Sequence, residues 1–170
     1  MPGAGAPPPE SEDRLALQAY VAHQSRGLPI APDEDVRLAP FRERGRQRFE
    51  QRIGQLNLAC TQCHDARAGG RLGGSMIPHA HPTGYPAYRL EWQSLGSLQR
   101  RLRNCMSGVR AEPYAYGATE FVEPELHLMQ RARGGTFTPG QNLPNLPNPI
   151  DLRVENDGHT LISTAGIRLL

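Results

Sequence analysis

The chain of 170 residues has no lysine, only three cysteines and no long apolar segment. All 19 of its basic residues counted as Lys or Arg are arginine. The formal net charge is only +2, which argues against nucleic acid as a partner. No run of 18 apolar residues occurs, so the sequence predicts no membrane span. Hydrophobic residues make up 38% of the chain, which indicates one domain with a modest core plus extensions.

Two of the three cysteines stand in the run Cys60-Thr61-Gln62-Cys63-His64. This C-x-x-C-H pattern is the attachment signature of a c-type haem, in which both thiols form thioethers and the histidine ligates the iron. A redox-active dithiol would follow a strand in a βαβ pattern, and a structural zinc site would need further ligands from a second knuckle. The sequence shows neither, so it predicts one covalently attached haem c outside the cytoplasm.

The remaining cysteine is a candidate for the second axial ligand of that iron. Leu95, Leu98, Leu102 and Cys105 follow the 3-4-3 spacing of one helical face, whereas Met106 is rotated by about 100°. Residue type leaves the choice open, because small cytochromes usually use methionine or histidine as the second ligand. The other candidates are Met106, Met76, Met129, His79 and His81.

Arg101 stands four residues before Cys105, one turn away on the same expected helical surface. A planar guanidinium recognises oxyanions well, and nearby positive charge favours a thiolate. The spacing therefore indicates an anion-binding position beside the cysteine sulfur. A solvated helix face is the ordinary alternative for a run of arginines.

Three blocks of sequence carry a resemblance to a known family: residues 55–65, 81–93 and 110–117. Together they are similar to SoxA, the c-type cytochrome subunit of the SoxAX complex in bacterial thiosulfate oxidation. The similarity runs from about Leu15 to Gly134. It is much more specific than the C-x-x-C-H pattern alone.

The resemblance implies an L-cysteine S-thiosulfotransferase of the periplasm. Cys60 and Cys63 would hold the haem, His64 would be the proximal ligand, and Cys105 would be the distal ligand and catalytic sulfur, which is a persulfide in such proteins. Arg101 would bind thiosulfate. The implied partners are a SoxX-like cytochrome, the carrier SoxYZ, whose cysteine receives thiosulfate, and a cytochrome c electron acceptor.

Two other functions fit the same residues. One is a c-type cytochrome that only carries electrons, with Met106 or a histidine as the distal ligand. The other is a truncated and inactive product, because the first 14 residues lack the basic start and apolar segment of a secretory signal. The start of the chain is therefore expected to be truncated or wrongly assigned.

Periodicity predicts an all-α cytochrome c fold with long haem-wrapping loops, an N-terminal extension and an irregular C-terminal tail. Phe41, Gly45, Phe49 and Ile53 recur every four residues, and Gly45 would allow another helix to approach closely, as the first and last helices of cytochromes c do. Phe121, Leu126 and Met129 are expected to face inward from the last helix, which would start near Glu123 because of Pro124. The helices are expected at 15–26, 41–53, 91–106 and 119–133, with a loop at 69–87.

Four segments are expected along the chain. Residues 1–14 are a disordered N-terminus, and residues 15–39 are a remnant helix of a truncated domain plus an acidic linker. Residues 40–134 are the haem domain. Residues 135–170 are a Pro/Asn-rich tail, in which residues 151–164 could form a hairpin around Asn156-Asp157-Gly158.

Overall fold

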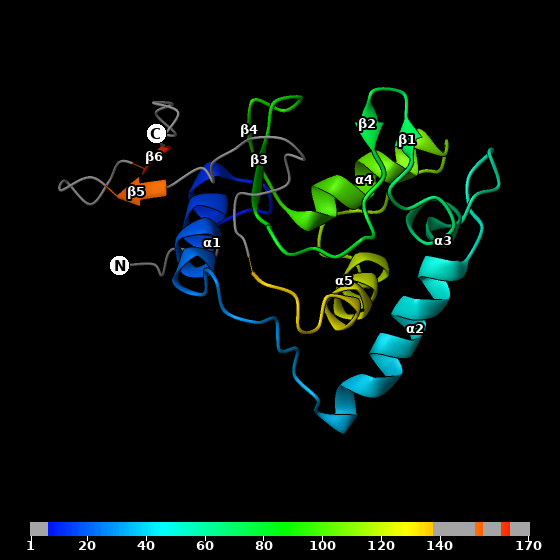
Figure 1. The fold of residues 1–170 in the computed structure, drawn as a ribbon, viewed down its shortest axis with the longest axis horizontal. Helices are drawn as coiled ribbons and strands as arrows, with labels where there is room; N and C mark the ends of the chain where they lie inside the picture. Colours follow the sequence, from blue (N-terminus) through cyan, green and yellow to red (C-terminus); the bar gives the residue numbers. More distant parts are fainter. Residues whose placement is uncertain (1–6, 138–151, 155–160, 164–170) are drawn as a thin grey trace. The chain divides into compact units, whose positions relative to one another are not determined.

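A computed structural model describes residues 7–137, 152–154 and 161–163 (Figure 1). These residues form two compact units. The first unit holds residues up to Leu28 together with Gly84–Ser97, and the second holds Pro29–Thr83 and Leu98–Thr136. By these contacts residues 84–97 group with the N-terminal helix, and the haem domain at 40–134 stays a prediction.

The first unit is built from helix α1 (Glu12–Gln24) and a hairpin of β3 (Ala87–Arg89) and β4 (Ser94–Gly96). Ser11 caps α1 by accepting a hydrogen bond from the backbone N–H of Arg14, so the helix begins three residues before the predicted start. Leu15 and Ala19 of α1 form a core cluster with Leu95 of β4.

The hairpin corrects the predicted helix at 91–106. Tyr88 pairs with Leu95 across the two strands, and Gln93 in the connecting turn has φ +50°, which an α-helix does not allow. Leu95 is buried because it packs on α1, so tertiary contact overrides the helical spacing seen in the sequence.

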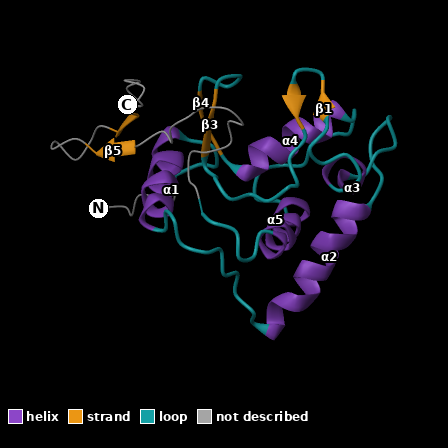
Figure 2. Ribbon diagram, viewed as in Figure 1, coloured by secondary structure: helices purple, strands orange, loops and turns teal. Residues whose placement is uncertain are grey.

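The second unit holds four α-helices and one short hairpin (Figure 2). A 3₁₀ turn precedes α2, and α2 runs directly toward the short helix α3. The elements are the 3₁₀ turn Val36–Leu38, α2 (Ala39–Glu50), α3 (Cys60–His64), β1 (Arg71–Leu72), β2 (Ser75–Met76), α4 (Leu98–Gly108) and α5 (Thr119–Arg131).

The all-α prediction is correct only in part. Helices dominate, but the described residues also contain three two-stranded antiparallel sheets. The expected haem-wrapping loop at 69–87 includes the β1–β2 hairpin. Strands β5 (Leu152–Val154) and β6 (Leu161–Ser163) confirm the pairing expected near the C-terminus, and the turn between them lies outside the described residues. No helix in the described ranges is both long and apolar enough to cross a membrane.

Helices α2 and α5 lie against each other, as Figure 1 shows. Gly45 of α2 is in close contact with α5. A Cβ atom at Gly45 would lie 2.1 Å from the carbonyl oxygen of Glu123 and 3.0 Å from the Cβ of His127. The structure therefore confirms that Gly45 permits the close approach of a second helix.

Ion pairs to a buried glutamate also connect α2 with α5. The carboxylate of Glu123, whose side chain is only 2% exposed, accepts hydrogen bonds from Nε of Arg44 at 2.6 Å and from Nε of Arg48 at 3.1 Å. These arginines lie one turn apart on α2, and the hydrogen bond from Arg44 is the main reason why the pKa of Glu123 is lowered. The charged residue is thus compensated by both arginines.

The inward face of α5 differs from the prediction. Phe121, Glu123 and Leu128 are the buried residues of the helix, whereas Leu126 and Met129 are half-buried. Pro124 lies inside the helix, which already begins at Thr119. The contacts of Phe121 and Glu123 therefore outweigh the loss of one backbone hydrogen bond at Pro124.

Helix α2 is also shorter than the four-residue repeat suggested. Phe49 is buried, but Phe41 is 43% exposed near the N-terminal end of α2. Ile53 lies beyond the helix and forms a backbone bridge with Leu58. Gly45 and Phe49, the central pair of the repeat, are the ones that face α5.

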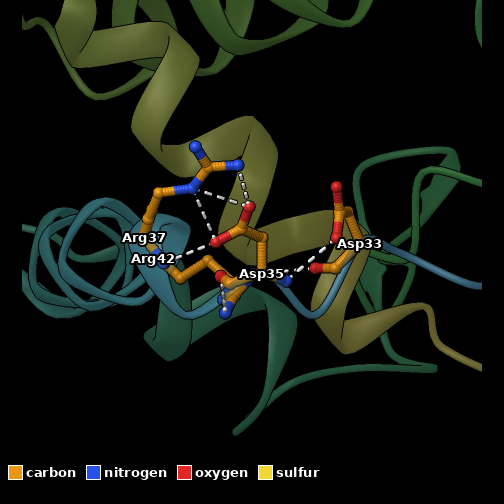
Figure 3. A network of polar contacts seen from close by, with 4 residues as sticks. All are labelled: Asp33, Asp35, Arg37 and Arg42. Atoms are coloured by element: carbon orange, nitrogen blue, oxygen red, sulfur yellow. Dashed lines mark hydrogen bonds and ion pairs between the residues drawn. The ribbon is translucent and has the colours of Figure 1, made fainter.

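The acidic linker is ordered by its own arginines (Figure 3). Asp35 caps the 3₁₀ turn by accepting from the backbone N–H of Arg37 at 2.8 Å, and the Arg37 side chain also binds its carboxylate. Arg42 of α2 donates to the carbonyl oxygens of Asp33 at 2.8 Å and Asp35 at 3.2 Å. These contacts set the start of α2, and the Arg37 hydrogen bond lowers the pKa of Asp35.

Replacing Gly45 with alanine is expected to destabilise the second unit by about 3 kcal/mol, because backbone atoms of α5 would have to move away from the new methyl group. The free energy of unfolding from urea titration measures this effect. Gly108→Ala is the matched control, since a Cβ at this helical glycine meets no atom within 4 Å. Equal stabilities of the two variants would contradict the close contact at Gly45.

Candidate haem-binding site

The C-x-x-C-H motif forms the single-turn helix α3 in the second unit. The side chain of Gln62 accepts a hydrogen bond from the backbone N–H of Ala59 at 2.8 Å, which closes the turn at its start. Cys60 and Cys63 are three residues apart on this helix, so both thiols lie on one side of it. Both are half-buried.

The ring of His64 is oriented by the loop that follows α3. Its Nδ1 lies 2.7 Å from the carbonyl oxygen of Pro78. Because a carbonyl can only accept, Nδ1 must carry the proton, and Nε2 is then the nitrogen with a lone pair for a metal. An outer hydrogen bond of this kind fixes the tautomer of a ligating histidine and raises its basicity.

Cys105 of α4 acts electrostatically on Cys60, the first cysteine of the motif. Burial raises the pKa of Cys60 to about 11, and the next cause is electrostatic repulsion from Cys105, with smaller contributions from Cys63 and Asp65. Charges act most strongly on a pKa at short range, so this effect connects Cys105 electrostatically with the motif although it is far from it in sequence. Membership of Cys105 in the haem site stays a prediction.

The loop that leads into α3 is attached to the C-terminal end of α4. The backbone N–H groups of Gln55 and Leu56 donate to the carbonyl oxygens of Arg110 and Val109, both at 3.3 Å. Gly54 makes this approach possible, because it has φ +69° and its Cβ would lie 2.1 Å from the Val109 oxygen. This contact holds the helix of Cys105 beside the attachment motif.

Met106 does not share the position of Cys105. It is the one buried residue of α4, with 9% exposure, whereas Cys105 is half-buried. The sequence placed Cys105 on the buried helical face together with Leu95, and this was wrong because Leu95 lies on β4 and Met106 packs in the core. Cys105 is half-buried, as are Leu98 and Leu102 of the same expected face.

Arg101 shares α4 with Cys105, and the other candidate ligands lie on other elements. Arg101 is half-buried on α4, one turn before Cys105 as expected. His79 and His81 stack with their ring centroids 6.0 Å apart in the exposed loop after β2, and Met76 is 46% exposed on β2. Met129 is half-buried on α5. The roles assigned to Arg101 and Cys105 stay predictions.

The donor set fits a covalently attached haem. It offers two thiols and one oriented imidazole on a single turn of helix, and a third thiol from a separate helix nearby. Cys60 and Cys63 could form two thioether bonds, and the imidazole and the third thiol are of the types that ligate haem iron. Within the described residues no group of three or more His, Cys, Asp or Glu side chains is arranged to hold a single metal ion.

Sequence analysis missed one group of contacts near His64. Arg131, at the end of α5, forms an ion pair with Asp65 and also donates to the carbonyl oxygen of His79 at 3.4 Å. Asp65 and Arg131 are 66 residues apart, so no helical or strand spacing connects them in the sequence.

Comparison with known proteins places the chain in one family, although no family model matches it. It is 33% identical over 122 residues to the L-cysteine S-thiosulfotransferase subunit SoxA of Rhodovulum sulfidophilum, covering 72% of this chain and 42% of that protein. The SoxA of Allochromatium vinosum is 36% identical over 123 residues, covering 69% of this chain and 44% of that protein.

A solved structure agrees with these sequences. The SoxXA structure from P. pantotrophus matches with a TM-score of 0.76 and 27% identity, over 79% of this chain and 51% of that chain. The described fold is therefore that of a SoxXA cytochrome. The chain spans about half the length of the curated relatives it matches. On these similarities, together with the motif and the site, the chain belongs to the SoxA family.

Proposed function

We propose that this chain is a haem c-containing subunit of an L-cysteine S-thiosulfotransferase in the periplasm, acting in bacterial thiosulfate oxidation. The observation that supports this most directly is the similarity to L-cysteine S-thiosulfotransferase subunits, which covers the C-x-x-C-H motif and the helix of Cys105. The electrostatic effect of Cys105 on Cys60 and the hydrogen bonds between the motif loop and the end of α4 support it further.

Cys60 and Cys63 would attach one haem through thioether bonds, and His64 would ligate its iron through Nε2. Pro78 holds the imidazole in this orientation through the hydrogen bond at Nδ1. Bound haem supplies a one-electron redox centre next to the reacting sulfur. The two thiols and the imidazole thus attach and ligate the haem. Substrate binding and reaction are assigned to residues of α4.

Cys105 is the distal ligand and the catalytic sulfur, and Arg101 binds thiosulfate. The guanidinium of Arg101 offers two parallel N–H donors to the oxygens of the dianion, which offsets the cost of removing it from water. The overall reaction joins the terminal sulfur of thiosulfate to the thiol sulfur of the carrier cysteine. One S–S bond forms, the thiol releases one proton, and two electrons leave to cytochrome c.

The proposed partners are a SoxX-like cytochrome subunit, the SoxYZ carrier as the protein substrate and a cytochrome c electron acceptor. The related crystal structure is of a SoxXA complex, which supports the first of these. A simple electron carrier with Met106 as distal ligand is not favoured, because Met106 is buried in the core and Cys105 is the α4 residue that acts electrostatically on Cys60.

The experiment that tests this function is thiosulfate-dependent mass gain on the SoxYZ cysteine, measured with the haem-loaded chain, its SoxX-like partner and oxidised cytochrome c. Arg101→Lys is expected to lower kcat/KM for thiosulfate by about 10- to 100-fold, because one charge-assisted hydrogen bond of the bidentate pair is lost. The haem spectrum should stay unchanged.

Arg103→Lys is the matched control on the same helix. The Arg103 side chain donates to the carbonyl oxygen of Tyr114 and lies 4.8 Å from the ring centroid of Tyr116, so it is engaged elsewhere. Its substitution should change kcat/KM by less than about threefold. A similar loss in both lysine variants would mean that general positive charge, and not Arg101 itself, recognises thiosulfate.

A further inference from the structure

We propose that Arg131 is a positioning residue that sets the strength of the hydrogen bond between His64 and Pro78. The inference rests on the haem attachment proposed above and extends it to a residue outside the ligand set. Arg131 is at the C-terminal end of α5, and its side chain is 24% exposed.

The Arg131 side chain contacts two acceptors beside the His64–Pro78 hydrogen bond. Nη2 of Arg131 binds Oδ1 of Asp65 and lies 3.4 Å from the carbonyl oxygen of His79. Asp65 directly follows His64, and His79 directly follows Pro78. One guanidinium nitrogen therefore holds the residue next to each partner of the His64–Pro78 hydrogen bond.

The Arg131 guanidinium also packs against the ring of Phe49. The Arg131 carbon Cζ lies 4.7 Å from the ring centroid of Phe49, which is buried in α2 at the crossing with α5. The cation–π contact fixes the plane of the fork against the helix pair. The Arg131 side chain thereby connects the loop that carries Pro78 with the α2–α5 helix pair.

The strength of the hydrogen bond at Nδ1 affects how a ligating histidine binds a metal. A stronger hydrogen bond from Nδ1 makes the imidazole a more basic ligand, which favours the oxidised metal. Loss of the Arg131 contacts would free the segment at Pro78 and His79 and weaken the bond at Nδ1. Arg131 thus acts through His64, without touching the metal or the substrate.

The test uses the full chain, exported to the periplasm of a bacterium that attaches haem c, and measures covalent haem and the reduction equilibrium of the iron. Arg131→Gln and Asp65→Asn should both retain haem. Each should raise the ratio of reduced to oxidised iron at a fixed ambient potential about threefold, which corresponds to about 28 mV for a one-electron couple. The double variant should shift no further than the larger single effect.

Arg133→Gln is the matched control, because Arg133 lies at the same helix end and its side chain pairs with Glu34 and not with Asp65 or His79. It should leave the potential unchanged. Asp65→Asn keeps the contact between Arg131 and Phe49, so it remains informative if Arg131→Gln folds poorly. Haem-loaded variants with an unmoved potential, or an equal shift in Arg133→Gln, would overturn the inference alone. A parent chain without covalent haem would overturn the proposed function with it.

Discussion

Cys105→Met is expected to abolish thiosulfate conjugation and to leave haem covalently attached. The variant removes the thiol of α4 that acts electrostatically on Cys60. The two cysteines expected to attach haem, Cys60 and Cys63, are unchanged. Methionine can still ligate iron, so a low-spin spectrum should persist with an altered potential. The measurement is mass gain on the SoxYZ cysteine against time, with a decrease of at least about 10³-fold expected for loss of a nucleophile.

The matched control is Met106→Leu on the next residue. Met106 is buried, so a volume-conserving change should cost under about 1.5 kcal/mol of stability and leave turnover intact. Normal thiosulfate turnover by Cys105→Met would end the catalytic role of Cys105. Loss of turnover in both variants would point to damage of α4 instead.

Replacing both Cys60 and Cys63 with alanine is expected to remove covalent haem completely. No other thiol is available on α3 to form a thioether, and Cys105 comes from a different helix. Intact-mass measurement of the denatured protein should show the mass of one haem on the parent and none on the double variant. The same measurement on the parent reports any additional sulfur on Cys105.

Each single alanine variant provides the internal control. One remaining thioether should keep haem attached, and the pyridine haemochrome band should move because one vinyl group is left unreacted. Haem that acid-acetone extracts from the parent chain would contradict covalent attachment. Zinc found in place of haem would contradict the assignment of the motif altogether.

Local patterns in the sequence predicted the parts of the site that depend on near neighbours. The motif at Cys60–His64 contains both thiols and the imidazole within one helical turn, so its chemistry could be predicted without a fold. Gly45 was predictable for a similar reason, because a glycine one turn before a buried aromatic indicates close helix packing. The structure confirms that α5 is the helix that packs there.

Prediction failed where burial depends on a distant partner. Leu95 fits a helical face by spacing, but its packing on Leu15 of α1 places it in a strand. The inward face of α5 likewise depends on Arg44 and Arg48, which make a glutamate at position 123 a buried residue. Single-sequence periodicity assigns apolar side chains to the core and cannot identify a buried charge whose partners are on another helix.

The contacts of Arg131 were beyond prediction for a further reason. The chain has 19 arginines and 17 acidic residues, so many pairings are possible and charge alone selects none of them. Only the fold shows that Arg131 meets Asp65 and the loop after β2. Sequence could have indicated that the residue after His64 is charged, but not which arginine it binds.

The contact between Gly54 and Val109 has a consequence for the order of folding. It joins positions far apart in the chain, so loop-closure entropy makes it slow to form compared with the local turn of α3. The attachment cysteines are therefore expected to reach their local geometry early. The Cys105 sulfur is expected to approach them only when α4 docks. A maturing chain would thus pass through a stage in which the motif is accessible to haem and Cys105 is still remote from it.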